Sequence, residues 1–172
     1  MDAYADRLEG VGLAAGANAA LLASQVQRYR PRLVAMATAH ALDRARAAFD
    51  PHRPDAVAVG PDGLVAVATH PDVDVVLCAS SGTAALEAVL AAIERGKAIA
   101  LANKEVLVMA GGIVTEAARR MGVPILPVDS EHNAIHQCLR GRNPAEVTRL
   151  ILTASGGPLW NLKGELVGIN GM

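Results

Sequence analysis

Aromatic residues are scarce in this sequence: they make up 2% of the 172 residues, whereas hydrophobic residues make up 52%. The core must therefore be built from Ala, Val and Leu, as in a parallel sheet covered by alanine-rich helices. An excess of charge is lacking too, because the formal net charge is −1, which gives no electrostatic case for nucleic acid or an anionic membrane as a partner. No apolar run approaches the roughly 18 residues of a membrane span.

Cysteine is equally rare. Cys78 and Cys138 lie far apart in the sequence and form no CxxC pair, so we expect reduced thiols in a cytoplasmic protein. The first residues do not have the composition of a signal peptide. A length of 172 residues favours a single main domain.

Short apolar segments alternate with helical segments along most of the chain. The predicted strands are residues 11–15, 32–37, 55–59, 73–79, 98–102, 125–128 and 149–153, of which 73–79 is the clearest buried strand. Helices are predicted up to residue 29 and at 39–49, 84–95, 104–121 and 130–139. Residues 63–69 suit a helix or a strand, and we prefer the helix. This alternation predicts an α/β fold with a doubly wound, mostly parallel sheet and right-handed crossovers.

The pattern changes near the end of the chain. Residues 159–162 and 165–169, joined at Lys163-Gly164, predict a β-hairpin. We therefore divide the sequence into a main domain, residues 1–154, and a tail of a glycine loop and hairpin, residues 155–172.

Two carboxylates follow the apolar segment 125–128. Asp129 and Glu131 lie two residues apart, and on an extended backbone such positions point to the same side. Carboxylates that converge repel each other unless a cation lies between them, and hard oxygen ligands suit Mg²⁺ or Mn²⁺ better than Zn²⁺. The alternative is that both are solvated residues at the start of a helix, with Ser130 as its cap.

Other polar clusters also follow predicted strands. Asn103, Lys104 and Glu105 come after residues 98–102, and a lysine at such a place can hold a phosphate or a reacting oxygen, or simply face solvent. The turn Ser80-Ser81-Gly82 precedes a helix whose exposed amides favour an anion, or it is an ordinary turn capped by serine. The turn from Gly16 to Asn18 is equally ambiguous.

Two further patterns suggest chemistry less specifically. His132 and His136 share a face of the predicted helix beside Glu131, which invites a zinc interpretation, but no third ligand lies at a known spacing. Ser155 opens a Ser-Gly-Gly-Pro loop that could bind phosphate, act as a nucleophile with an oxyanion hole, or be a flexible turn.

Several segments in series resemble one family, 1-deoxy-D-xylulose 5-phosphate reductoisomerase. The matching segments are Leu-Ala-Asn-Lys-Glu-Val-Leu-Val from residue 101, Leu-Pro-Val-Asp-Ser-Glu-His-Asn-Ala-Ile-His-Gln-Cys-Leu from residue 126, and Ile-Leu-Thr-Ala-Ser-Gly-Gly-Pro from residue 151. The stretches 12–16 and 95–97 also fit in order and spacing, so the likeness covers about residues 7 to 158.

The resemblance implies a Rossmann-like fold and an NADPH-dependent enzyme of isoprenoid biosynthesis. Family members convert 1-deoxy-D-xylulose 5-phosphate to 2-C-methyl-D-erythritol 4-phosphate by the methylerythritol phosphate route. A divalent cation, Mg²⁺ or Mn²⁺, holds the substrate's oxygens during rearrangement, and NADPH then reduces the aldehyde. The resemblance thus implies a small phosphorylated sugar as the substrate.

Residue roles follow from the same resemblance. It implies metal binding by Asp129 and Glu131, with Lys104 and both carboxylates as catalytic residues. For the substrate it implies contacts from Lys104, Ser130 and Glu131, and phosphate binding by Ser155. For NADPH it implies contacts from four residues, which are Gly16, Asn18, Asn103 and Glu105. The basic residue that the family usually has between the first two is Ala17 here.

Other features depart from the family pattern. The family's first strand and its Gly-Ser-Thr-Gly-Ser-Ile-Gly turn have no counterpart here, nor do a third metal carboxylate, a loop over the substrate and a C-terminal helical domain. Without that central strand, segments 11–15 and 73–79 must pair with each other or leave open edges that invite association, such as a homo-oligomer. The turn at Ser80 lacks the family's apolar form. We expect weak metal binding and no turnover by this chain alone.

The tail carries a second resemblance. Residues 155–170 resemble the nucleophile segment of HtrA-type serine proteases, although Thr153-Ala154 replaces the residues usual before the serine, and such proteases need a double β-barrel. A serine protease fragment is thus a remote alternative. A nearer one is an α/β module that binds or oligomerises without catalysis.

Overall fold

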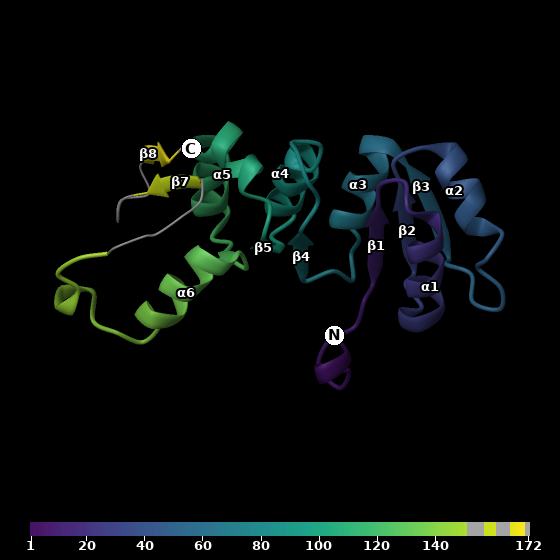
Figure 1. Cartoon of the computed structure of the whole chain (residues 1–172), viewed down its shortest axis with the longest axis horizontal. Coiled ribbons are helices and arrows are strands. Elements are labelled where there is room, and N and C mark those ends of the chain that lie inside the picture. Colours follow the sequence, from purple (N-terminus) through teal and green to yellow (C-terminus); the bar gives the residue numbers. More distant parts are fainter. Residues whose placement is uncertain (151–156, 161–165, 171–172) are drawn as a thin grey trace. The chain divides into compact units, whose positions relative to one another are not determined.

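The computed structural model describes residues 1–150 and the backbone of residues 157–160 and 166–170. These residues divide into two compact units, Met1–Asp74 and Val75–Met172. Each unit contains a three-stranded parallel sheet, in the orders β1-β2-β3 and β4-β5-β6 (Figure 1). The predicted α/β fold with mostly parallel strands is therefore confirmed. The boundary that we placed at residue 154 stays a prediction.

The first unit alternates strands and helices from the start. After a 3-10 helix, η1 (Asp2–Tyr4), its elements are β1 (Gly12–Ala15), α1 (Ala19–Tyr29), β2 (Leu33–Met36), α2 (Ala39–Arg46), β3 (Ala56–Val59) and α3 (Gly60–Ala68). The preference for a helix at residues 63–69 is confirmed. α2 ends at Arg46, three residues earlier than predicted, and the chain continues to the buried ring of Phe49.

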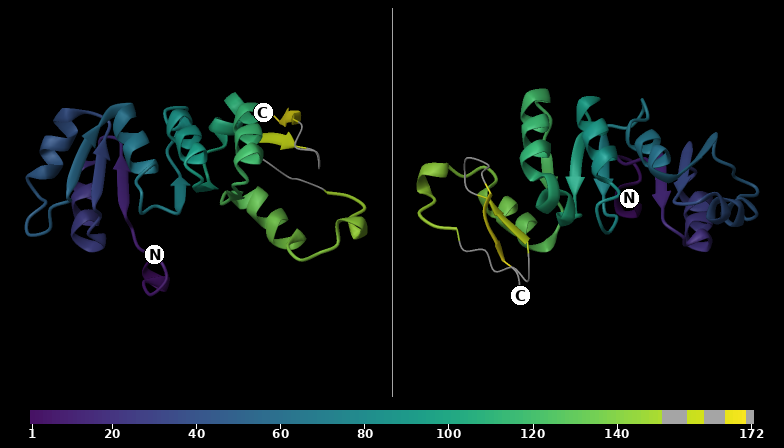
Figure 2. Two further views of the ribbon diagram at one scale, coloured as in Figure 1. Left: turned by 180° about the vertical axis from the view of Figure 1, so that it is seen from behind. Right: turned by 90° about the horizontal axis from the view of Figure 1, so that it is seen from above.

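Side chains alternate between the two faces of the first sheet. Val34 and Met36 of β2 point to the face where α1 and α2 pack, and with Leu22, Val26 and Leu42 they form the core of the unit. The opposite face is covered by α3 (Figures 1 and 2). Small residues let α3 approach closely: a Cβ at Gly63 would lie 3.0 Å from the Cβ of Ala35 and 3.2 Å from the backbone of Ala58.

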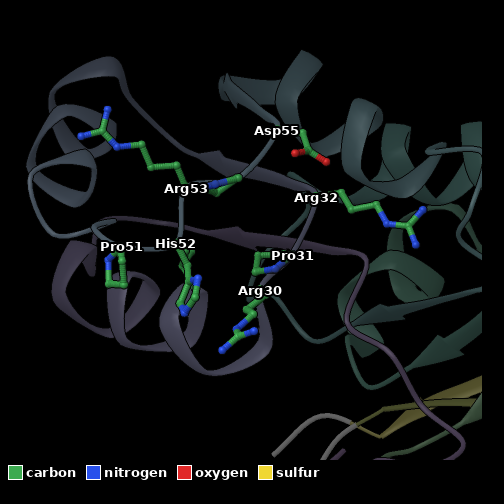
Figure 3. Close-up of a pocket in the computed structure, with 9 residues that line it drawn as sticks. Arg30, Pro31, Arg32, Pro51, His52, Arg53 and Asp55 are labelled. Atoms are coloured by element: carbon green, nitrogen blue, oxygen red, sulfur yellow. The ribbon is translucent and has the colours of Figure 1, made fainter.

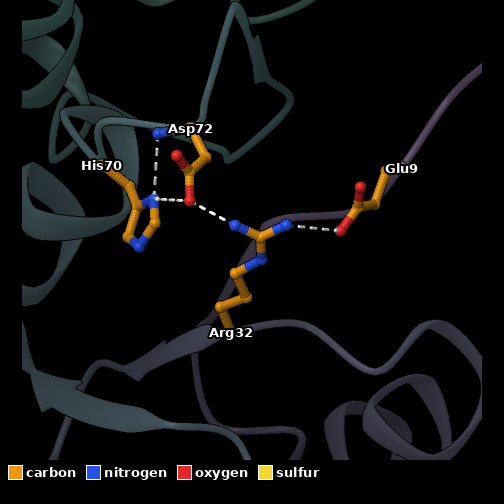
Figure 4. A network of polar contacts seen from close by, with 4 residues as sticks. All are labelled: Glu9, Arg32, His70 and Asp72. Carbon is orange, nitrogen blue, oxygen red and sulfur yellow. Dashed lines mark hydrogen bonds and ion pairs between the residues drawn. The ribbon is translucent and has the colours of Figure 1, made fainter.

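Ion pairs join three segments of the first unit at the amino ends of its strands (Figure 4). The guanidinium of Arg32, just before β2, contacts Asp72 and lies 3.2 Å from Oε1 of Glu9. Oδ2 of Asp72 also lies 3.9 Å from Nδ1 of His70. The pKa of Arg32 is raised, chiefly by the charge of Asp72. Since these side chains are substantially exposed, solvent weakens the pairs, and their contribution to stability is small.

The second unit continues the alternation. Its elements are β4 (Val75–Cys78), α4 (Leu86–Glu94), β5 (Ala98–Leu101), α5 (Lys104–Met121), β6 (Ile125–Pro127), α6 (Ser130–Leu139), the 3-10 helix η2 (Pro144–Glu146), and the strands β7 (Gly157–Trp160) and β8 (Leu166–Asn170). β7 and β8 pair antiparallel, as the predicted hairpin requires. Residues 149 and 150 are not in a strand, so the strand predicted at 149–153 fails there, and the rest of it lies outside the described residues.

β4 is not the buried strand that the sequence predicted. Of its four residues only Cys78 is buried, while Val75 and Leu77 are 52% and 65% exposed. Val75 and Leu77 pair with Ala98 and Ala100 of β5, whereas the buried residues Ile99 and Leu101 pair with Val76 and Cys78. Since alternate residues point to opposite faces, the face of Ile99 and Leu101 is covered and the face of Leu77 is exposed. The prediction was wrong because a continuous apolar run is typical of a strand that is covered on both faces, and here one face is exposed.

β1 and β4 each lie at an edge of their sheet. Within the part of the chain that the structure describes, β1 pairs only with β2 and β4 only with β5. The expected choice between pairing of these two strands and open edges stays a prediction, because the strands belong to different units. No helix in the same part of the chain combines the length and the apolar character that crossing a bilayer requires.

Candidate functional site

Polar residues gather where β5 and β6 end. These strands are neighbours, with Leu101 opposite Pro127, and the amide of Val128 donates to the carbonyl of Leu101 at 3.1 Å. The carboxyl ends of parallel strands are where α/β proteins bind ligands. The segment that begins with Asn103 and the segment that begins with Asp129 therefore leave the sheet at the same edge.

A helix begins in each of these two segments. Asn103 is the N-cap of α5 and Asp129 is the N-cap of α6, where its Oδ2 accepts from the amide of His132 at 3.2 Å. The interpretation with Ser130 as the cap was therefore wrong by one residue. A short polar side chain at this position satisfies an amide that the helix leaves unpaired, and the helix dipole adds a favourable interaction with a carboxylate.

Glu131 lies among the other charged residues of the site. Its pKa is lowered first by a hydrogen bond from the hydroxyl of Ser130 to Oε2, at 2.8 Å. The charge of Lys104 also lowers this pKa, and the charge of Asp129 raises it. Lys104 and Asp129 therefore lie within electrostatic range of Glu131, although Lys104 comes from another segment of the chain. The hydroxyl of Ser130 is turned toward Glu131.

Two carboxylates at one edge are the right chemistry for a hard divalent cation but only part of its ligand set. Through the described residues, no cluster of three or more His, Cys, Asp or Glu side chains is placed to hold a metal. Asp129 also contacts Nδ1 of His132, which directs that ring to the carboxylate. The zinc interpretation of His132 and His136 gains no third ligand.

The remaining predicted site residues lie in three different parts of the chain. Glu105 and Lys104 are exposed at the start of α5, and Asn103 beside them is buried. Gly16 and Asn18 lie in the first unit, after β1, where the side chain of Asn18 caps α1 by accepting from the amide of Leu21 at 3.0 Å. Ser155 lies outside the described residues. The residues predicted at the ends of β5 and β6 follow two neighbouring strands, and their roles stay predictions.

One contact across the second sheet was missed by the sequence analysis. The side-chain amide of Asn103 donates to the carbonyl oxygens of Ser80 and Gly82, at 2.5 and 2.7 Å. The two segments are more than twenty residues apart. The usable signal was that both follow predicted neighbouring strands, whose ends lie at one edge of the sheet.

A shallow cavity of about 230 Å³ lies elsewhere, in the first unit (Figure 3). It is lined by residues that precede β2 and β3, among them Arg30, Pro31, His52 and Asp55. These residues lie at the amino ends of the strands, opposite the edge where parallel sheets bind ligands. The guanidinium groups of Arg30, Arg32 and Arg53 point in different directions, so they do not form a common anion site.

Comparisons with known proteins agree on one family. A family model described as 1-deoxy-D-xylulose 5-phosphate reductoisomerase matches residues 1–111, and the model of its C-terminal domain matches residues 125–168. The reductoisomerase of Anaeromyxobacter sp. (strain K) is 54% identical over 91% of this chain and 40% of its own length. That of Chlamydia trachomatis (serovar L2, strain 434/Bu) is 51% identical over 87% of this chain and 39% of its own length.

Solved structures give the same result. The enzyme from Zymomonas mobilis in complex with NADPH is 39% identical, with a TM-score of 0.74 over 80% of this chain and 36% of that one. A reductoisomerase in complex with magnesium is 34% identical, with a TM-score of 0.75 over 80% of this chain and 34% of that one. The chain spans about two fifths of the length of the curated relatives. By these matches, the chain belongs to the 1-deoxy-D-xylulose 5-phosphate reductoisomerase family.

Proposed function

We propose that this chain carries the metal-site and NADPH-site part of a 1-deoxy-D-xylulose 5-phosphate reductoisomerase. The reaction is the rearrangement and NADPH-dependent reduction of that phosphorylated sugar to 2-C-methyl-D-erythritol 4-phosphate. The observation that supports the proposal is that Lys104, Asp129 and Glu131 follow β5 and β6, neighbouring parallel strands that end at one edge of the sheet, with Lys104 and Asp129 in electrostatic range of Glu131. Chemistry of this kind needs acidic oxygens and a cationic group within reach of one small substrate.

Each residue has a proposed task. Asp129 and Glu131 hold the divalent cation, Mg²⁺ or Mn²⁺, and Glu131 with Ser130 also contacts the substrate. Lys104 stabilises negative charge on a substrate oxygen. Glu105 and Asn103 belong to the NADPH side, with Gly16 and Asn18, and Ser155 binds the substrate phosphate. When bound, the cation polarises substrate oxygens and NADPH supplies a hydride.

Relatives support the choice of ligands. A solved reductoisomerase, 34% identical to this chain, is described in complex with NADPH, fosmidomycin and magnesium. In the part of the chain that the structure describes, the carboxylate pair lacks a third acidic ligand, so we expect weak metal binding and no turnover by this chain alone. We place the protein in the cytoplasm, where its two free cysteines would stay reduced.

The test measures binding and turnover separately. We would titrate the chain with Mn²⁺ and with NADPH by calorimetry, and assay NADPH oxidation with deoxyxylulose phosphate and Mn²⁺. Weak Mn²⁺ binding that is lost in Asp129→Asn, together with NADPH binding, supports the proposal. A chain that binds neither ligand would refute it.

A second function is favoured by the exposed apolar residues of β4. Val75 and Leu77 lie on the open face of the second sheet, and an uncovered apolar face next to an open edge invites association. The chain would then be a module that oligomerises without catalysis. Light scattering that shows stable oligomers, in a chain without NADPH or Mn²⁺ binding, would favour this function over the first.

A further inference from the structure

Among the residues that the structure describes, one polar side chain is buried: that of Asn103, with an exposed fraction of 3%. A buried carboxamide is costly unless its donors and acceptor are all paired. Its neighbours in the sequence, Lys104 and Glu105, are exposed. Burial at this position, at the edge that carries the proposed site, therefore needs a physical explanation.

The hydrogen bonds of Asn103 supply the explanation. A primary amide has two N–H donors and one carbonyl acceptor. Nδ2 donates to the carbonyl of Ser80 at 2.5 Å and to that of Gly82 at 2.7 Å, while Oδ1 accepts from the amide of Val106 at 3.2 Å. Both donors are thus used within the protein, and the amide has no N–H left to offer a bound molecule.

These bonds join the two segments that follow the neighbouring parallel strands β4 and β5. One is the exposed turn between β4 and α4, and the other is the first turn of α5, which carries Lys104 and Glu105. The backbone strengthens the link, because the amide of Asn103 donates to the carbonyl of Cys78 at 3.1 Å. Asn103 therefore holds the turn 80–82 at a fixed place relative to Lys104.

We infer that Asn103 is a positioning residue, which serves NADPH binding by holding the turn 80–82 and not by contacting the dinucleotide with its side chain. The inference rests on the proposed function and deepens it, because it assigns the contact with the cofactor to the exposed backbone of the turn. Residues that orient metal ligands cost about 10–100-fold in affinity when they are lost, and we expect an effect at the lower end of that range here.

The test replaces the donors and keeps the cap. Asn103→Asp retains an oxygen for the amide of Val106 but puts a carboxylate against two carbonyl oxygens. Asn143→Asp is the matched control, since Asn143 is an exposed cap whose Oδ1 accepts from the amide of Ala145 at 3.1 Å. For each variant of the full chain we would measure amide hydrogen exchange at Ser81 and Gly82 and the dissociation constant of NADPH.

We expect Asn103→Asp to speed exchange in the turn by about tenfold and to weaken NADPH binding by a similar factor, with no change in the control. Lowering the pH should partly reverse both effects, because a protonated carboxyl regains one donor. If Asn103→Asp does not fold, Asn103→Ser keeps a capping oxygen and removes both N–H donors of the carboxamide, and the same two effects are expected.

The outcomes separate this inference from the proposed function. Weaker NADPH binding with unchanged exchange in the turn would overturn the inference, because the side chain would then act directly. Unchanged exchange and unchanged binding would overturn it as well. Faster exchange in a chain whose parent does not bind NADPH would leave the positioning role in place and refute the cofactor site.

Discussion

Oδ2 of Asp129 accepts a hydrogen bond from the backbone amide of His132 at 3.2 Å, so a proposed metal ligand is also the N-cap of a helix. The two roles make different demands. Capping needs only an oxygen that accepts, which Asp and Asn supply equally well, whereas a hard divalent cation prefers the charged carboxylate. Substitutions at this residue can therefore separate metal binding from helix stability.

Asp129→Asn is expected to weaken Mn²⁺ binding by roughly tenfold or more, because ligand charge controls affinity for hard cations. The free energy of unfolding should fall by about 1 kcal/mol or less, since the cap remains while the interaction of the charge with the helix dipole is lost. Calorimetry and urea unfolding measure the two effects. Asp62→Asn, in the first turn of α3, is the control and should leave Mn²⁺ affinity unchanged. Equal affinities of Asp129→Asn and the parent would remove the metal assignment.

Ser130→Ala should raise the pKa of Glu131, because the hydroxyl of Ser130 is the main cause of its lowered value. A carboxylate whose pKa is lowered by folding adds stability above its unfolded pKa, and this stability is lost as the pH falls through the folded pKa. The variant should therefore lose some stability at neutral pH and little in strong acid. NMR titration of the Glu131 carboxyl gives the pKa directly.

The control for that titration is Ser24→Ala. The hydroxyl of Ser24 donates to the carbonyl of Leu21 at 2.8 Å, on a helix of the first unit. The pKa of Glu131 should be the same in this variant as in the parent. An equal shift in both variants would show that loss of the Ser130 hydrogen bond is not the cause.

The two thiols should differ in reactivity. Burial raises the pKa of the Cys78 thiol, and Cys138 is exposed. Since the thiolate is the reactive form, an alkylating reagent at pH 8 or so should modify Cys138 quickly and Cys78 slowly. Mass spectrometry of timed samples measures both rates. In Cys138→Ser the fast phase should vanish, and fast labelling that persists would contradict the burial of Cys78.

Substitutions on the two faces of the second sheet should have very different effects on stability. Ile99 is fully buried, so Ile99→Ala should lower the free energy of unfolding by about 2–5 kcal/mol. Leu77 is 65% exposed, so Leu77→Thr should change it by less than about 0.5 kcal/mol and reduce the binding of a hydrophobic dye. Urea unfolding and dye fluorescence test this pair. Strong destabilisation by Leu77→Thr would mean that the face is covered.

Most of the fold could be predicted because the local signals agree with the final packing. Alternating apolar and helical segments, with polar residues at each strand end, gave the elements and the parallel class. Burial of β4 could not be predicted in this way. The run around Val75 and Leu77 is equally apolar whether or not a second layer covers it, so the sequence does not distinguish the two cases.

The candidate site was predicted in part for a similar reason. Glu131 and Lys104 are recognisable because each follows an apolar strand, and neighbouring strands end at one edge. The bond from Asn103 to Ser80 depends on side-chain geometry across two strands, which spacing does not encode. The choice of Asp129 over Ser130 as the cap depends on which residue leaves the helical conformation, and both residue types are good caps.

Helix α5 has an interruption between the end that carries Lys104 and the rest of the helix. Ala110 has non-helical angles, φ −139° and ψ 26°, and the hydroxyl of Thr115 satisfies the carbonyl of Gly111 just beyond. Val114 and Ala118, past this break, are buried. The break therefore divides α5 into two helical pieces that are each held by their own buried residues, with Val106 in the piece that carries Lys104 and Val114 in the other.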